Sequence, residues 1–149
     1  MTDDRDLLAR AVELARRCPP SRTAFSVGAL VVDAGGVVLA EGWSRRRDPH
    51  DHAEESALAD LGRGWRAPPC TTVYSSLEPC SARSSRPLTC TELILAAGVD
   101  RVVFAWREPS VFVDGEGAEL LRARGVEVVE LPELAAAARG PNAHLLEAR

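Results

Sequence analysis

The stretch CTELILAAGVDRVVFAW (residues 90–106) joins a helix pattern to a strand pattern through a glycine. Residues 91–97 predict a helix that ends at Gly98, because glycine readily adopts the left-handed conformation that closes helices. Residues 101–106 predict a buried strand, since the centre of this segment is a continuous apolar run. A helix that leads directly into a buried strand is typical of α/β proteins.

The same alternation continues outward in both directions. It predicts helices at 4–17, 52–61 and 117–124, and strands at 27–32, 37–40, 71–76 and 126–130. The first two of these strands form a hairpin, because turn residues 33–36 separate them. We therefore expect an α/β fold, a three-layer α/β/α sandwich around a mixed five-stranded sheet. Residues 1–149 form a single domain, in which the alanine-rich and polar segment 132–149 is expected to be peripheral.

Composition and charge exclude several classes of protein. The 18 basic residues are all arginine against 22 acidic residues, so the net charge is -4 and lysine chemistry is impossible. A net acidic chain makes a nucleic-acid partner unlikely. No run reaches the roughly 20 apolar residues of a membrane span, and the acidic start lacks the features of a signal peptide. We expect a cytoplasmic protein that does not bind membranes.

Three groups with metal-ligand chemistry fall at the ends of the predicted elements: His52, Cys80 and Cys90. One imidazole and two thiolates leave the fourth position of a tetrahedral zinc site open for water, as in catalytic sites. Glu54, two residues after the histidine, can take a proton from that water. The alternative is that His52 caps a helix and the cysteines are small buried side chains. Cys18 and Cys70 lack such a context and are expected to be buried thiols.

The spacing of the cysteines adds a further feature. A His-x-Glu sequence followed by Pro-Cys-x-x-Cys is the signature of zinc deaminases. In this chain, nine residues rather than two separate Cys80 from Cys90. The intervening segment 81–89 is therefore long enough to arch over a pocket.

Longer motifs resemble one family. They are His52-Ala53-Glu54, Leu77-Glu78-Pro79-Cys80-Ser81, Arg86 four residues before Cys90, Ala96-Ala97-Gly98-Val99, Glu108-Pro109 and Val113-x-Gly115-x-Gly117. The chain resembles the cytidine-deaminase-like superfamily and, within it, the pyrimidine deaminases of riboflavin biosynthesis. The likeness covers about the whole chain, and the downstream glycines are its most specific part.

The resemblance implies one zinc-dependent deaminase domain over residues 1–149. His52, Cys80 and Cys90 would bind Zn²⁺, and Glu54 would shuttle the proton. Backbone amides near Ala53 and Cys80 would hold the attacking oxygen, and the Ser76 carbonyl the leaving amine. The implied substrate is the diaminohydroxy-ribosylaminopyrimidine 5'-phosphate of riboflavin biosynthesis, which would lose ammonia. A homodimer or homotetramer and a separate reductase are the implied partners.

Some positions depart from the family pattern. Ala24 stands where the family has an asparagine for the ribose, and Ala82-Arg83 replaces a histidine pair. With no lysine present, Arg45, Arg83 and Arg86 are candidates to bind a phosphate, since arginine binds phosphate with two parallel hydrogen bonds. The alternative for these arginines is a solvated surface.

Of the three tryptophans, Trp106 is the best candidate to stack on a planar base, and the alternative is that it belongs to the core. Two other functions remain open: a deaminase of the same fold acting on another amino-heterocycle, which Ala24 and the altered cysteine loop favour, and a non-catalytic zinc-binding scaffold, which the intact Glu54 disfavours.

Overall fold

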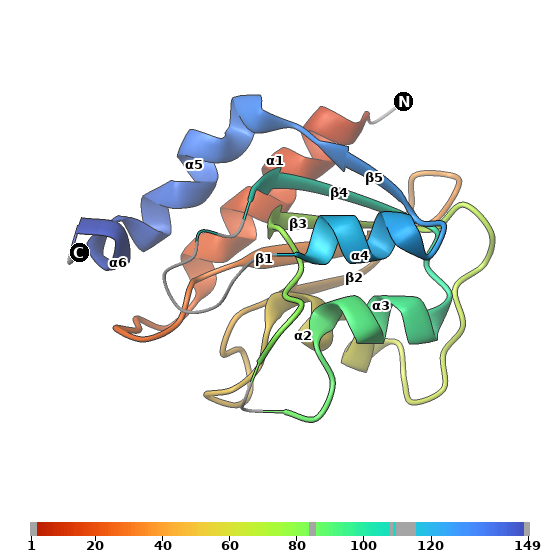
Figure 1. Ribbon diagram of the computed structural model, residues 1–149, viewed down its shortest axis with the longest axis horizontal. Helices are drawn as coiled ribbons and strands as arrows, with labels where there is room; N and C mark the ends of the chain where they lie inside the picture. Colours follow the sequence, from red (N-terminus) through yellow and green to blue (C-terminus); the bar gives the residue numbers. More distant parts are fainter. Residues whose placement is uncertain (1–2, 84–85, 108, 110–115, 148–149) are drawn as a thin grey trace.

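The computed structural model describes residues 3–83, 86–107, 109 and 116–147, and its centre is a five-stranded sheet in the order β2-β1-β3-β4-β5 (Figure 1). The strands are β1 (Gly28–Val32), β2 (Val38–Trp43), β3 (Thr72–Leu77), β4 (Arg101–Trp106) and β5 (Glu127–Glu130). Strand β1 pairs antiparallel with both of its neighbours, whereas β3, β4 and β5 are parallel. The predicted mixed sheet is confirmed.

Helices cover both faces of the sheet, which confirms the three-layer sandwich. Helices α1 and α5 lie on one face, and α2, α3 and α4 lie on the other (Figure 1). The helices are α1 (Asp4–Leu14), α2 (Ala53–Asp60), α3 (Cys90–Ala97), α4 (Gly117–Ala123), α5 (Ala135–Arg139) and α6 (Ala143–Glu147). Short 3₁₀ turns are η1 (Ala15–Arg17), η2 (Pro132–Leu134) and η3 (Gly140–Asn142). No helix in the described part of the chain is long and apolar enough to cross a membrane.

The ends of the elements follow from local chemistry. Helix α3 begins after Thr89, whose hydroxyl accepts a hydrogen bond from the Glu92 N–H, and it ends at Gly98 with φ +78°. Strand β1 is buried at every position, as its unbroken apolar run predicts. Strand β2 runs on to Trp43, beyond the predicted end at residue 40, and alternates between buried and half-buried positions. This alternation fits its place at the edge of the sheet.

Helix α2 packs unusually close to β2 because of one glycine. A Cβ on Gly42 would lie 2.2 Å from the Ala53 carbonyl oxygen and 2.5 Å from the Ala57 backbone nitrogen. Only a residue without a side chain permits this approach. The position of α2, which begins directly after His52, is therefore fixed against the sheet.

The segment after β5 is not the peripheral tail that its composition indicates. Ala135, Ala138 and Leu145 are buried in the same apolar cluster as the inner face of α1, and Asn142 is 1% exposed. Small alanine side chains let α5 lie close to the sheet, so the alanine-rich composition here reflects close packing rather than exposure. This segment completes the helical layer on the α1 side of the sheet.

Candidate active site

His52, Cys80 and Cys90 meet at one end of the sheet, as the sequence predicts. Their potential ligand atoms all lie within 4.8 Å of one another. The His52 Nδ1 atom is 3.4 Å from the Cys80 Sγ and 3.3 Å from the Cys90 Sγ. Both cysteines are buried and unpaired. One imidazole nitrogen and two sulfurs at this separation are a donor set that suits zinc, with one tetrahedral position left over.

Three elements bring these side chains together. His52 lies at the N-terminal end of α2, Cys80 follows the carboxyl end of β3, and Cys90 is the first residue of α3. The backbone N–H and the hydroxyl of Thr91 both donate to the Cys80 carbonyl oxygen, at 3.1 and 2.8 Å. The Cys90 N–H donates to the Cys80 sulfur at 3.2 Å. The start of α3 therefore holds Cys80 in place through both its backbone and its side chain.

The surroundings of the two thiols favour a thiolate at Cys80. Hydrogen bonds from the Cys90 thiol and His52 outweigh burial and lower the pKa of Cys80 to about 4. The same contact, with Cys90 as the donor, and complete burial raise the pKa of Cys90 well above its ordinary value. A helix N-terminus also stabilises a nearby thiolate. One negative sulfur is thus already favoured where a cation would bind.

Glu54 lies on the first turn of α2 beside this cluster and is 4% exposed. Burial, followed by the nearby negative charge of Cys80, raises the pKa of its carboxyl group. Its Oε1 atom lies 3.2 Å from the hydroxyl of Ser75 on β3, a residue that sequence reasoning did not single out. A buried carboxyl group whose pKa is raised in this way takes up a proton more readily than an exposed one, as a group that transfers protons must.

A cavity of about 670 Å³ opens next to these groups. Its walls include His52, Glu54 and Cys80, together with the backbone of α2 at Ala53. The remaining lining residues come from residues 20–27, 44–51, 77–78 and 82–83. Ala24 lines the cavity with only a methyl group. A volume of this size accommodates a small heterocyclic ligand.

The predicted phosphate-binding arginines are paired with protein groups. The Arg45 guanidinium donates to the carbonyl oxygens of Pro19 and Phe25, and burial lowers its pKa. Arg83 donates to the His50 carbonyl oxygen at 2.8 Å, and its side chain is 4% exposed.

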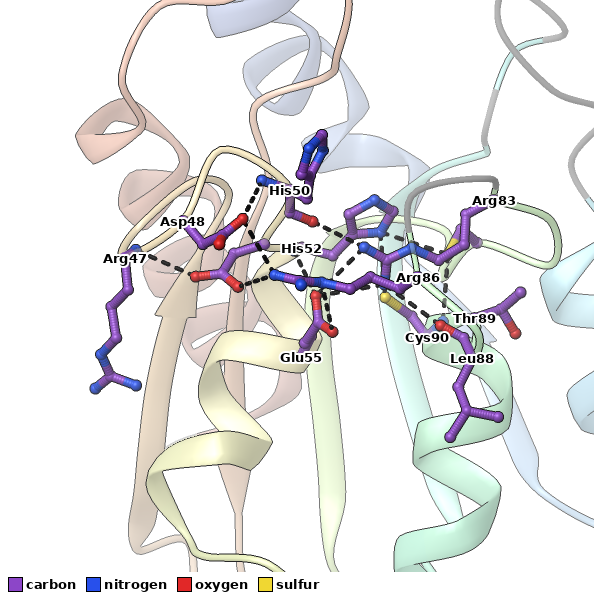
Figure 2. Close-up of polar contacts among 12 residues, drawn as sticks. Arg47, Asp48, His50, His52, Glu55, Arg83, Arg86, Leu88, Thr89 and Cys90 are labelled. Carbon is purple, nitrogen blue, oxygen red and sulfur yellow. Dashed lines mark hydrogen bonds and ion pairs between the residues drawn. The ribbon is translucent and has the colours of Figure 1, made fainter.

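Figure 2 shows the guanidinium groups of Arg83 and Arg86 close to Glu55 of α2. The Glu55 carboxylate oxygens lie 3.3 Å from the Arg83 Nη2 atom and 3.6 Å from the Arg86 Nε atom. The Arg86 Nη2 atom also lies 3.1 Å from the Asp48 Oδ1 and 3.3 Å from the Asp51 Oδ1. The Glu55 carboxylate in turn accepts the His52 N–H at 3.2 Å. Through these ion pairs, Arg83 and Arg86 tie the segment between Cys80 and Cys90 to the N-terminal end of α2, where His52 lies. The sequence analysis did not single out Glu55, and its place three residues after the N-cap His52 is the signal that could have identified it.

Other predicted site residues lie away from the cavity lining. Ser76, Arg86 and Trp106 are described residues that do not line it. The Ser76 hydroxyl accepts a hydrogen bond from the Gly28 N–H on the neighbouring strand. The Trp106 ring packs edge-on against Phe25 within the apolar core, with ring centroids 5.4 Å apart. Glu108, Val113 and Gly115 of the family motifs lie outside the described residues.

The other two cysteines differ from expectation. Cys18 is half-buried, with its sulfur 3.4 Å from the Val27 carbonyl oxygen. Cys70 is exposed and has a φ of +65°, so the prediction of a buried thiol is wrong there. It follows two prolines and precedes a buried strand, in a turn that places its side chain in solvent.

The sequence model of the cytidine and deoxycytidylate deaminase zinc-binding region matches residues 1–106, which include Glu54 and all three residues of the cluster. The chain belongs to this deaminase family. Two curated family members are similar over 84% of the chain. They are the diaminohydroxyphosphoribosylamino-pyrimidine deaminase of Schizosaccharomyces pombe, 37% identical, and the riboflavin biosynthesis protein RibD of Escherichia coli, 35% identical. The chain spans 31% and 33% of their lengths, about one third of each.

Solved structures of the deaminase family agree with the fold. RibD of Acinetobacter baumannii superposes on 95% of the chain with a TM-score of 0.77 and 30% identity, over 38% of its own length. A Thermotoga maritima diaminohydroxyphosphoribosylaminopyrimidine deaminase/5-amino-6-(5-phosphoribosylamino)uracil reductase superposes on 96% of the chain with a TM-score of 0.74 and 30% identity, over 41% of its length. The three-layer sandwich is therefore the deaminase fold.

Proposed function

We propose that this protein is a zinc-dependent hydrolytic deaminase of an amino-pyrimidine, and that its substrate is the diaminohydroxyphosphoribosylaminopyrimidine of riboflavin biosynthesis. The observation that carries the proposal is a buried carboxyl group, Glu54, beside a His-Cys-Cys cluster at the wall of a cavity. The names of the similar proteins support the choice of substrate.

His52, Cys80 and Cys90 would hold the zinc ion. When bound, zinc lowers the pKa of a coordinated water towards about 7 and so supplies a nucleophile at neutral pH. The three side chains fit this task, because their donor atoms lie close together and the thiolate form of Cys80 is favoured. The hydrogen bonds from Thr91 and Cys90 keep Cys80 in position before any ion arrives.

Glu54 would move the protons. One oxygen of its carboxylate accepts a proton from the attacking water and delivers it to a ring nitrogen of the substrate. The second proton of the water leaves with the amino group, so water and the amine become a carbonyl group and ammonia. The raised pKa of Glu54 suits both steps, since its buried carboxylate accepts a proton more readily than an exposed one does and can then deliver it to the substrate. Ser75 holds Oε1 in place from β3.

The backbone around the cavity would stabilise developing negative charge. Ala53 is the first residue of α2 and lines the cavity, and the first N–H groups of a helix have no partner within the helix. The positive ends of α2 and α3 both face the cluster, because His52 and Cys90 lie at their N-termini. The N-terminal ends of both helices would thus stabilise the negative charge that develops on the attacking oxygen.

A second candidate substrate class is an amino-heterocycle without a phosphate. The pairing of Arg83 and Arg86 with Glu55, Asp48 and Asp51 favours it, because these carboxylates already neutralise the guanidinium groups. Ala24 offers no hydrogen bond to a ribose.

The test is ammonia release from the purified zinc-loaded protein with the phosphorylated riboflavin precursor, its dephosphorylated form, cytidine and guanine. The proposal expects the phosphorylated precursor to have the highest kcat/KM. Turnover confined to unphosphorylated compounds would instead establish the second candidate.

We further propose that residues 1–149 act as one deaminase domain, that it assembles as a homodimer or homotetramer, and that its product passes to a reductase. The deaminase/reductase name of the similar Thermotoga maritima chain supports the last point. Sedimentation of the purified protein tests its assembly. A coupled assay with an added reductase tests the fate of the product.

A further inference from the structure

Residues 19–26, here called the pocket loop, form a large part of the cavity wall without belonging to any helix or strand. The cavity-lining members of the pocket loop are Pro20, Ser21, Thr23, Ala24 and Phe25. A segment that lacks the regular backbone hydrogen bonds of a helix or strand needs hydrogen-bond partners elsewhere to keep a single conformation. Two side chains that are distant from the pocket loop in sequence supply those partners.

The first partner is Arg45, which follows β2. Its guanidinium donates to the Pro19 and Phe25 carbonyl oxygens at 2.7 and 3.0 Å and to the Ser26 hydroxyl at 2.6 Å. The Arg45 backbone has a φ of +59°, a left-handed conformation that is unfavourable for a residue other than glycine. The hydrogen bonds to the pocket loop offset the cost of this conformation.

The second partner is Asn142, which lies in the C-terminal segment, 116 residues after Ser26. Its Oδ1 atom accepts the Ser26 N–H at 2.6 Å, and its Nδ2 atom donates to the Ser26 carbonyl oxygen at 3.0 Å. Nδ2 also lies 3.3 Å from the Ala138 carbonyl oxygen on α5. One side-chain amide therefore pairs both backbone groups of Ser26, as a neighbouring strand would.

These contacts are buried, which makes them decisive for the loop. Asn142 is 1% exposed and Ser26 is 7% exposed. Removal of the amide would leave a buried N–H and a buried carbonyl oxygen unpaired, and each is costly unless water reaches it. The loop would therefore have to move. His144 adds a second, exposed contact, where its Nε2 atom lies 2.7 Å from the Ser21 carbonyl oxygen.

We propose that Asn142 is a positioning residue for catalysis: from the C-terminal segment it sets the shape of the pocket loop, and thereby substrate affinity, without touching the substrate. Asn142 does not line the cavity, whereas the loop that it holds does. The consequence for turnover rests on the proposed function. The consequence for the loop rests only on the hydrogen bonds.

The experiment compares Asn142→Ala with the parent protein by hydrogen exchange, zinc content and steady-state ammonia release. We expect faster exchange in residues 19–28, unchanged protection of α2 and α3, and an unchanged zinc content. We expect KM to rise roughly tenfold while kcat changes less than about twofold, because misplaced contacts weaken binding without altering the reacting groups. Arg139→Ala, an exposed change in the same segment, is the matched control and should leave all these quantities unchanged.

Two results would overturn the proposal: unchanged exchange and KM in Asn142→Ala, or a loss of zinc and of protection throughout the chain, which would indicate a merely structural role. If Asn142→Ala does not fold, His144→Ala tests whether contacts from the C-terminal segment hold the pocket loop, and unchanged exchange and KM in this variant would overturn the proposal. It removes only the exposed contact to Ser21, and we expect a KM increase of about threefold with faster loop exchange. If the parent releases no ammonia from any substrate, the proposed function fails, while the exchange data still decide whether Asn142 holds the loop.

Discussion

Replacement of Gly42 by alanine should damage both stability and activity, because it forces α2 away from the sheet. The added Cβ would lie 2.2 Å from the Ala53 carbonyl oxygen, whereas ordinary contact begins at 3.4 Å. The contacted atoms belong to the helix backbone and cannot rotate away. Helix α2 must therefore retreat from β2 by about 1 Å.

The size of both effects follows from this displacement. Overpacking of a buried position costs roughly 1–3 kcal/mol, so we expect the free energy of unfolding to fall by about 2 kcal/mol. For a chain of this length, the melting temperature would then fall by about 4–8 °C. Because α2 carries Glu54 and begins after His52, a shift of about 1 Å in the reacting groups should lower kcat/KM on the order of 100-fold.

Urea unfolding and ammonia release measure the two effects. Gly35→Ala, in the exposed turn between β1 and β2, is the matched control, because an added Cβ would meet only the Asp33 Oδ1 atom at the ordinary contact distance of 3.4 Å. This control should match the parent in both assays. If Gly42→Ala unfolds within about 0.5 kcal/mol of the parent and keeps more than about half of its activity, the close approach of α2 does not position the site.

Two further predictions concern other parts of the fold. Asp4 accepts hydrogen bonds from Arg101 at 2.8 and 2.6 Å, and these bonds lower its pKa. Its stabilising contribution should be present above about pH 4 and lost as the pH falls through the lowered pKa. Asp4→Asn should therefore be less stable than the parent at pH 7, but not at pH 2, in thermal unfolding; an equal difference at both values would contradict this. In Gly117→Ala, the added Cβ would lie 1.9 Å from the Pro79 carbonyl oxygen, so the turn before Cys80 should shift and zinc affinity should fall about tenfold in a chelator competition. Unchanged affinity would show that α4 does not support this turn.

The proximity of His52, Cys80 and Cys90 could be predicted because all three lie at the ends of recognisable elements. His52, Cys80 and Cys90 each begin a helix or follow a strand, and the sheet brings such ends together. The position of Glu54 beside this cluster could be predicted as well, because it lies on the first turn of α2, two residues after His52.

The faces of the strands were harder to predict. The Ser75 side chain meets Glu54 while that of Ser76 meets the Gly28 N–H, because successive side chains of a strand point to opposite faces, and the sequence analysis did not single out Ser75. The sequence also did not tell to which face of β4 the Trp106 ring points. Trp106 was therefore a stacking candidate, whereas its ring lies in the core against Phe25. A pattern that is apolar on both faces does not tell which face meets the cavity.

Contacts between distant segments could not be read from the sequence. The arginines of the cysteine loop looked available for a phosphate, but Asp48, Asp51 and Glu55 meet Arg86 through the fold. The role of Asn142 likewise depends on a partner far along the chain. Hydrogen bonds of this kind leave no periodic pattern in a single sequence.

We propose that Glu54 moves protons beside a zinc ion held by His52, Cys80 and Cys90. The most direct test measures zinc content and ammonia release for the parent and for Glu54→Gln, which keeps the shape of the side chain and removes its acid–base chemistry. We expect about one zinc ion per chain in both proteins and a loss of turnover on the order of 1,000-fold in the variant. A variant that turns over at the parent's rate, or a parent that is active without zinc, would contradict the account.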